Sequence, residues 1–237
     1  MRATGIAAAL AFAATACAQE PIFEPGAILK VEAANGSGGE GPAWHPKLGL
    51  FTSGNGHVNL RSPDGQSRVY REGAGTNGLL LDRQGRLLAC EPKLRRVTRT
   101  EADGTVTVLA ERYQGKRFNQ PNDLTLDSRN RLYFSDPCYG DRSKLEMTDE
   151  QGRIVEGVTY RIDPDNTLTR IIGRELERPN GVLVSRDDKW LYVADNNNTI
   201  PAARESSGAS PCEPMVRSTK RLASCSTTGA RAVGRTG

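Results

Sequence analysis

The stretch that decides the fold is Asn122-Asp123-Leu-Thr-Leu-Asp127-Ser-Arg-Asn-Arg-Leu-Tyr-Phe-Ser-Asp136-Pro137. It reads as a polar residue, a short apolar strand, a polar turn and a second apolar strand, which is the pattern of a β-hairpin. The same pattern recurs position for position in residues 77–92, with one extra residue in 180–195, and more loosely in 40–54. The sequence therefore predicts four related hairpins.

A second predicted hairpin follows each of the first three copies, at residues 58–70, 96–109 and 159–172. Repeats of roughly 40–50 residues with four strands each are typical of a β-propeller. We therefore expect an all-β fold of the β-propeller type. Residues 19–198 supply about four blades, followed by an irregular C-terminal tail.

The polar residues that open the copies carry the functional prediction. In a propeller the innermost strands run along the central axis, so Glu40, Asn122 and Asn180 should face one mouth of the channel. A carboxylate with several amide oxygens suits Ca²⁺ or a similar divalent ion. The alternative is that an Asn before Gly or Asp only makes a turn, and we favour that interpretation for Asn77.

Arg117 lies shortly before Asn122 and should reach the same mouth, where it is a candidate contact for an anionic or oxygen-rich substrate group. The alternative is an ordinary surface arginine. Residues 138–157 form a long polar connection that either covers a binding site or is solvated. The sequence leaves both alternatives open.

The two termini depart from the repeat. Residues 1–18 have the charged, apolar and small-residue regions of a signal peptide, with lipid attachment at Cys17 as the alternative, so we expect an exported, periplasmic or secreted protein. Residues 199–237 carry six basic and two acidic side chains, which equals the whole net charge of +4. They form either a disordered tail or an out-of-frame segment. We expect no nucleic-acid partner and no transmembrane segment.

Several short motifs resemble one known family, the gluconolactonase/regucalcin (senescence-marker protein) family of six-bladed, calcium-dependent lactonases. The motifs, spread over about residues 38–198, are Glu40-Gly-Pro-Ala-Trp44, Asn77-Gly78, Gly115-Lys-Arg-Phe-Asn119, Pro121-Asn-Asp123, Phe134-Ser-Asp-Pro-Cys-Tyr-Gly140, Pro179-Asn-Gly181 and Tyr192-Val-Ala-Asp195. The resemblance implies one divalent ion (Ca²⁺, or Zn²⁺, Mg²⁺ or Mn²⁺) held by Glu40 and Asn180. It places Asn122 on the ion or the substrate and gives Asp123 a similar role.

The implied activity is hydrolysis of a small sugar lactone whose carbonyl the ion polarises. The family also uses an Asp from a later blade as ligand and general base, and no residue here matches it, so the catalytic residue stays unidentified. We therefore expect an incomplete propeller with impaired activity. The alternatives are a non-catalytic propeller that binds a ligand and a related metal-dependent esterase.

Overall fold

The computed structural model describes residues 23–28, 39–139, 141–173 and 176–196. The predicted signal peptide 1–18 with Cys17 and the predicted tail 199–237 lie outside these residues. Residues 23–28 belong to a first compact unit and form a turn that the Ala27 N–H closes on the Glu24 carbonyl, at 3.0 Å. All other described residues belong to the second unit.

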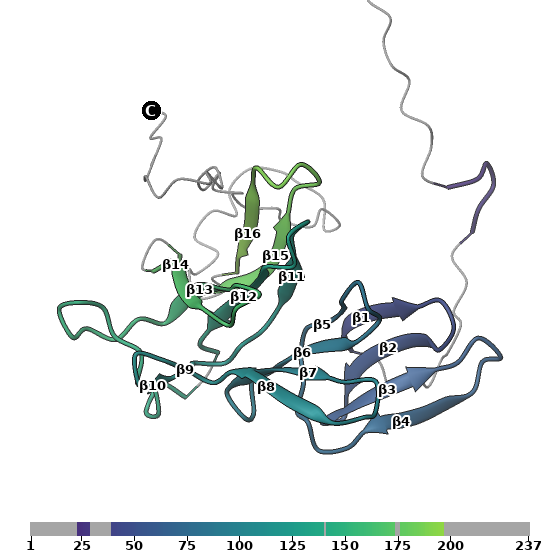
Figure 1. The fold of residues 1–237 in the computed structure, drawn as a ribbon, viewed down its shortest axis with the longest axis horizontal. Coiled ribbons are helices and arrows are strands. Elements are labelled where there is room, and N and C mark those ends of the chain that lie inside the picture. Colours follow the sequence, from purple (N-terminus) through teal and green to yellow (C-terminus); the bar gives the residue numbers. More distant parts are fainter. Residues whose placement is uncertain (1–22, 29–38, 140, 174–175, 197–237) are drawn as a thin grey trace, which may run out of the picture. The chain divides into compact units, whose positions relative to one another are not determined.

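The second unit consists of antiparallel sheets whose strands follow one another in chain order (Figure 1). The first three sheets have four strands each: β1 (Glu40–His45), β2 (Gly49–Gly54), β3 (His57–Arg61) and β4 (Ser67–Arg71); β5 (Leu79–Leu81), β6 (Leu87–Glu91), β7 (Arg96–Thr100) and β8 (Val106–Ala110); β11 (Leu124–Leu126), β12 (Leu132–Pro137), β13 (Gly157–Ile162) and β14 (Leu168–Ile172). A two-stranded sheet of β15 (Pro179–Val184) and β16 (Leu191–Asp195) follows.

These sheets confirm the four predicted hairpin copies and the three hairpins between them. Four-stranded antiparallel meanders repeated along the chain are β-propeller blades. The described residues hold three such blades and the first hairpin of a fourth. The sequence did not predict the short hairpin of β9 (Arg112–Tyr113) and β10 (Lys116–Arg117), which lies between the second and third blades.

Local turn chemistry explains why the hairpins form where they do. The Asp82 carboxylate accepts the N–H groups of Gln84 and Arg86, each at 2.9 Å, and also the Arg86 Nε at 2.7 Å. Asp127 holds the next blade's turn in the same way. The turn needs a left-handed residue, which Gly85 supplies at a φ of 78° and Asn130 at 59°.

Each hydrophobic core cluster lies between two consecutive blades. Side chains from the first and second blades share one cluster, for example Phe51 and Leu87. The second and third blades share the largest, in which Phe118, Phe134 and Tyr160 pack with ring centroids 5.1–5.2 Å apart. The third blade and β15–β16 share the last. Burial between blades therefore holds consecutive blades together.

A buried ion pair also joins the first two blades. The fully buried Glu91 carboxylate at the end of β6 accepts hydrogen bonds from Arg71 of β4 and Arg96 of β7, each at 2.6 Å, and from the Thr98 hydroxyl at 2.7 Å. A buried charge is tolerated when it is paired and hydrogen-bonded in this way. The contact fixes the first blade against the second.

The long connection between β12 and β13 is folded onto the core rather than freely solvated. Met147 and Val155 are 1% and 2% exposed within the largest cluster, and Thr148 pairs with Ile154 in an isolated bridge. None of the described segments forms a helix of the length and apolarity that a membrane crossing needs.

Candidate functional site

The first residues of the blades meet along one rim. The backbone after Glu40 touches the start of the second blade so closely that a Cβ on Gly41 would lie 2.3 Å from the Asn77 carbonyl oxygen. The Gly78 N–H donates to the Asn122 carbonyl at 2.7 Å, and the Val182 N–H donates to the Asp123 carboxylate at 3.1 Å. The predicted ligands Glu40, Asn122 and Asn180 therefore lie at the starts of the first, third and fourth blades, and neighbouring blades contact one another at this end of their strands.

In each blade, one residue of the second strand pairs with the residue at the start of the first strand, and in two blades its side chain reinforces these contacts. In the first blade the Ser53 hydroxyl donates to Thr76 of the second blade at 2.7 Å. In the third blade the Ser135 hydroxyl donates to the Asn180 carbonyl at 2.6 Å. The equivalent residue of the second blade is Cys90, a fully buried thiol whose pKa burial raises. The serines therefore link neighbouring blades at the rim.

The side chains of the three predicted ligands are available to different degrees. Asn122 is 7% exposed, and no hydrogen bond between described residues involves its amide. Glu40 is exposed and has no ion-pair partner among the described residues. The Asn180 Nδ2 donates to the Tyr139 hydroxyl at 2.9 Å. Neither amide atom of Asn122 is among the buried polar atoms that lack a partner, so the amide is open to solvent or to a ligand at the rim.

Asp123 is the half-buried carboxyl at this rim. Its Oδ2 accepts the Val182 N–H, and burial raises its pKa, although this bond and the one from the Leu124 N–H oppose the rise. A desolvated carboxylate is a stronger base than an exposed one. Asp123 can therefore hold a proton or coordinate a cation beside Asn122.

The donor set fits a hard divalent cation. Glu40, Asn122, Asp123 and Asn180 offer carboxylate and amide oxygens, which Ca²⁺ and Mg²⁺ prefer, and none offers sulfur or imidazole. The described residues contain no cluster of three or more His, Cys, Asp or Glu side chains placed to bind a metal. Any cation here would therefore depend on amide oxygens as well as carboxylates. No hydrogen bond within the described chain joins Glu40 directly to Asn122 or Asn180.

Arg117 lies away from these contacts. Its guanidinium donates to the Leu94 carbonyl at 2.8 Å, and its N–H donates to Glu146 at 3.1 Å. No described contact brings it to Glu40, Asn122 or Asn180, so a substrate contact by Arg117 stays a prediction. A hollow of about 280 Å³ is lined in part by Lys93, Asn119 and Gln120.

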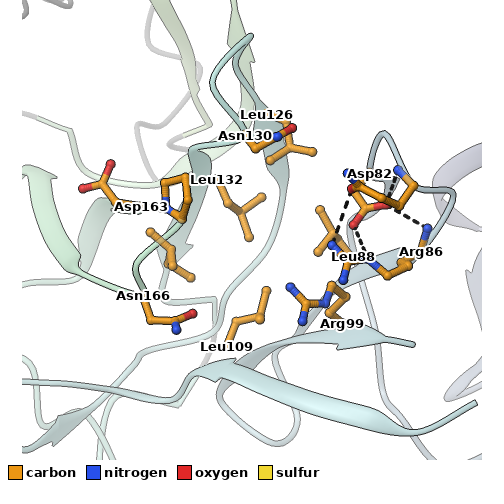
Figure 2. A pocket seen from close by; sticks show the side chains of 13 residues that line it. Asp82, Arg86, Leu88, Arg99, Leu109, Leu126, Asn130, Leu132, Asp163 and Asn166 are labelled. Atoms are coloured by element: carbon orange, nitrogen blue, oxygen red, sulfur yellow. Dashed lines mark hydrogen bonds and ion pairs between the residues drawn. The ribbon is translucent and has the colours of Figure 1, made fainter. Parts of the chain in front are cut away.

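A second hollow, of about 210 Å³, contains none of the predicted residues (Figure 2). Its lining combines apolar side chains of the second and third blades, such as Leu88 and Leu132, with polar and charged ones. The turns that begin at Asp82 and Asp127 lie at this end of the strands. Those turns close the opposite ends of β5 and β11 from Asn77 and Asn122. The candidate site therefore lies at the other end of the strands from this hollow.

The sequence did not indicate Ser135 or Tyr139 as residues of the site. Both stand in the motif Phe134-Ser-Asp-Pro-Cys-Tyr-Gly140. Their contacts with the site, however, are hydrogen bonds to Asn180, which lies 45 residues after Ser135 and 41 residues after Tyr139. The available signal was that Ser135 and Ser53 occupy the same position in two repeats.

Comparison with known protein families gives a match over more than half of the chain. A family model described as the SMP-30/gluconolactonase/LRE-like region matches residues 38–206. The chain belongs to this family. The match includes every strand of the described blades and all of the predicted site residues, as the sequence motifs indicated.

Individual relatives agree with the family match. The gluconolactonase of Zymomonas mobilis is 33% identical over 161 residues, which cover 67% of this chain and 43% of that protein. The solved gluconolactonase of Xanthomonas campestris is 36% identical, with a TM-score of 0.57 over 66% of this chain and 54% of that one. A further solved structure, described as an inferred gluconolactonase, is 30% identical with a TM-score of 0.62, over 73% and 61% of the two chains.

The chain thus spans less than half the length of the curated relative and less than two thirds of the solved ones.

Proposed function

We propose that this protein is a lactone hydrolase that requires a divalent cation, with Ca²⁺ as the first choice. The observation that carries the proposal is the rim at which the strand starts of successive blades meet. There the Asn122 amide makes no hydrogen bond to a described residue, and Glu40 and Asn180 occupy the equivalent positions of their blades. Membership of the family and the named relatives support lactones as the substrate class. The oxygen-only donor set supports the cation.

In this proposal Glu40, Asn122 and Asn180 would hold the cation. When bound, the ion would supply Lewis acidity that polarises the lactone carbonyl. Glu40 contributes the negative charge, and the amides orient the bound groups. The Asn122 amide lies at the end of a segment that Asp136 and Asn119 fix from within the core.

Asp123 would take the proton in this reaction. Hydrolysis adds water to the carbonyl carbon, breaks the ring C–O bond and places a proton on the ring oxygen, which gives a hydroxy acid. Burial raises the pKa of Asp123, so its carboxylate accepts a proton from water more readily than an exposed carboxylate would. The Val182 N–H holds Oδ2 in place. We expect the Asp123→Asn chain to lose about 10²- to 10⁴-fold in kcat.

The test measures hydrolysis of glucono-δ-lactone by the purified full chain, from proton release above the buffer blank. We expect EDTA to abolish the activity and CaCl₂ to restore it. Glu40→Gln should remove it, whereas Glu111→Gln, a change at an exposed residue outside the rim, should not. A rate equal to the blank in the presence of calcium would contradict the proposal and favour a non-catalytic binding propeller.

We also propose that the protein is exported, which cell fractionation would test.

A further inference from the structure

Tyr139 holds the side chain of Asn180 from the neighbouring blade. Asn180 Nδ2 donates to the Tyr139 hydroxyl at 2.9 Å. Tyr139 follows β12 of the third blade, whereas Asn180 lies in β15 of the fourth, and these two strands contact each other (Figure 1). With its nitrogen directed to Tyr139, the amide leaves Oδ1 on its other side. No described residue donates a hydrogen bond to that oxygen.

The β15–β16 ladder does not fix Asn180 itself. The register shifts between Pro179 and Val182, so Asn180 and Gly181 form a bulge outside the regular pairing. Bulges re-aim side chains and leave the extra residue unpaired in the ladder. Contacts from outside the hairpin must therefore set the direction of the Asn180 side chain.

The third blade also fixes the Asn180 backbone. The Ser135 hydroxyl donates to the Asn180 carbonyl at 2.6 Å and accepts the Asp123 N–H at 3.1 Å. One hydroxyl therefore ties the backbone of Asn180 to that of Asp123. With the backbone fixed, the remaining freedom of Asn180 is rotation of its side chain, and the Tyr139 hydroxyl removes it.

The Tyr139 ring is itself held in place. The Arg178 guanidinium lies over it at 5.9 Å from the ring centroid, a favourable cation–π distance. The Arg178 N–H donates to Asp195 at 2.7 Å, which fixes this residue to the end of β16. The hydroxyl is thus presented to Asn180 from a supported position.

We propose that Tyr139 is a positioning residue that directs the Asn180 amide oxygen toward the cation. This inference rests on the proposed function, because it takes Asn180 as a ligand. A hydrogen bond that orients a ligand contributes to metal affinity without touching the metal, and its loss costs about 10- to 100-fold in affinity. Tyr139 therefore matters to cation binding more than to folding.

The experiment compares calcium binding by the full wild-type chain and by Tyr139→Phe in isothermal titration calorimetry. We expect at least about tenfold weaker binding in the variant, with the circular dichroism spectrum unchanged. Tyr192→Phe is the matched control, because it removes the hydroxyl of a partly exposed tyrosine in β16, and it should bind calcium as the wild type does. Equal affinities in Tyr139→Phe and the wild type would overturn the inference and leave the proposed function standing.

A double-mutant cycle in metal-free buffer tests the hydrogen bond independently. Each single variant, Tyr139→Phe and Asn180→Ala, should lower the folding equilibrium constant by some factor. If the two side chains interact, the double variant should lower it by a factor that is about 3 to 10 times smaller than the product of the two single factors. A factor of one would show that the two side chains do not interact and would overturn the inference. A wild-type chain that binds no calcium contradicts the proposed function instead, and this cycle then decides whether the contact exists.

Discussion

Asp136 lies at the end of β12 with its carboxyl group fully buried. Its Oδ2 accepts the Asn119 N–H at 2.8 Å, while its Oδ1 has no hydrogen-bond partner among the described residues. Burial raises its pKa to about 7, although the N–H groups of Asn119 and Gln120 and the charge of Arg95 oppose the rise. Through its hydrogen bond with Asn119, the Asp136 side chain anchors the segment that leads to Asn122. The protonation state of Asp136 therefore affects a contact that holds this part of the candidate site.

The raised pKa predicts how stability depends on pH. The folded state binds the Asp136 proton more tightly than the unfolded state, whose Asp pKa is about 3.9. The stabilising contribution is therefore complete below pH ~4 and is lost as the pH rises to about 7. Asp136→Asn should remove this decrease in the free energy of unfolding between pH ~4 and about 7, which is on the order of a few kcal/mol. Urea unfolding of both chains between pH 4.5 and 7.5 measures the difference.

Asp165→Asn is the control for that measurement. Asp165 is an exposed turn residue whose pKa is lowered by hydrogen bonds from Thr167, so it finishes titrating below the tested range. Its substitution should leave the pH dependence between 4.5 and 7.5 unchanged. If the Asp136→Asn chain shows the same dependence as the wild type, the buried carboxyl does not carry the protonation we assign to it.

The strand starts show why glycine follows the polar residue in the first two copies of the repeat. A Cβ on Gly78 would lie 2.6 Å from the Asn122 carbonyl oxygen and 2.8 Å from the Asp123 Cα, so a side chain there would separate the second and third blades. Gly41 makes the same close approach to Asn77 and also has a φ of +55°. Close contact between neighbouring strand starts therefore requires glycine at these positions.

Gly78→Ala should accordingly lower the free energy of unfolding by about 1–3 kcal/mol, the usual cost of overpacking. Gly181→Ala is the matched control in the fourth blade, since its Cβ would meet only ordinary contacts at 3.8 Å. We expect it to change stability by less than half as much. Equal losses in urea denaturation of the two variants would show that the cost does not come from the close contact between the second and third blades, because Gly→Ala by itself lowers the entropy of the unfolded chain and stabilises the fold.

The hairpins could be predicted from the sequence because their determinants are local. Asp82 and Asp127 hold turns within five residues, and apolar alternation marks the strands on either side. The burial of Met147 and Val155 could not be predicted, because both stand in a largely polar segment and find their partners in distant strands.

The candidate site was predictable only in part, for a related reason. The repeat frame assigns Glu40, Asn122 and Asn180 to equivalent positions, and equivalent positions contact one another in a propeller. The frame carries no information on what holds each side chain. Tyr139 contacts Asn180 through an interaction between blades, and Arg117 is held by the Leu94 carbonyl instead of the rim.

At the scale of the second unit, stability comes from contacts between successive blades. Core clusters, the Glu91 ion pair and the hydrogen bonds of Ser53 and Ser135 each join one blade to the next. A cation that binds Glu40 of the first blade and Asn180 of the fourth would add a link between blades that are not consecutive. Folding and cation binding would then be coupled.

This coupling predicts that calcium raises the melting temperature. At a concentration 100 times its Kd, calcium should stabilise the folded chain by about 2.7 kcal/mol, which corresponds to roughly 5–10 °C for a domain of this size. Differential scanning calorimetry in CaCl₂, against NaCl of equal ionic strength, measures the shift. Glu40→Gln should lose most of it because the carboxylate supplies the ligand charge, whereas Glu111→Gln should keep it.

The pattern across variants separates a shared site from a local one. If the ion bridges the first and fourth blades, Glu40→Gln and Asn180→Ala should each reduce the calcium-induced rise in melting temperature. The double variant should then lose little more of this rise than the single variant with the larger loss, because both substitutions weaken the binding of the same ion. If calcium binds Glu40 alone, Asn180→Ala keeps the full shift. An undiminished shift in Glu40→Gln would place the calcium elsewhere in the chain and would remove the first blade from the site.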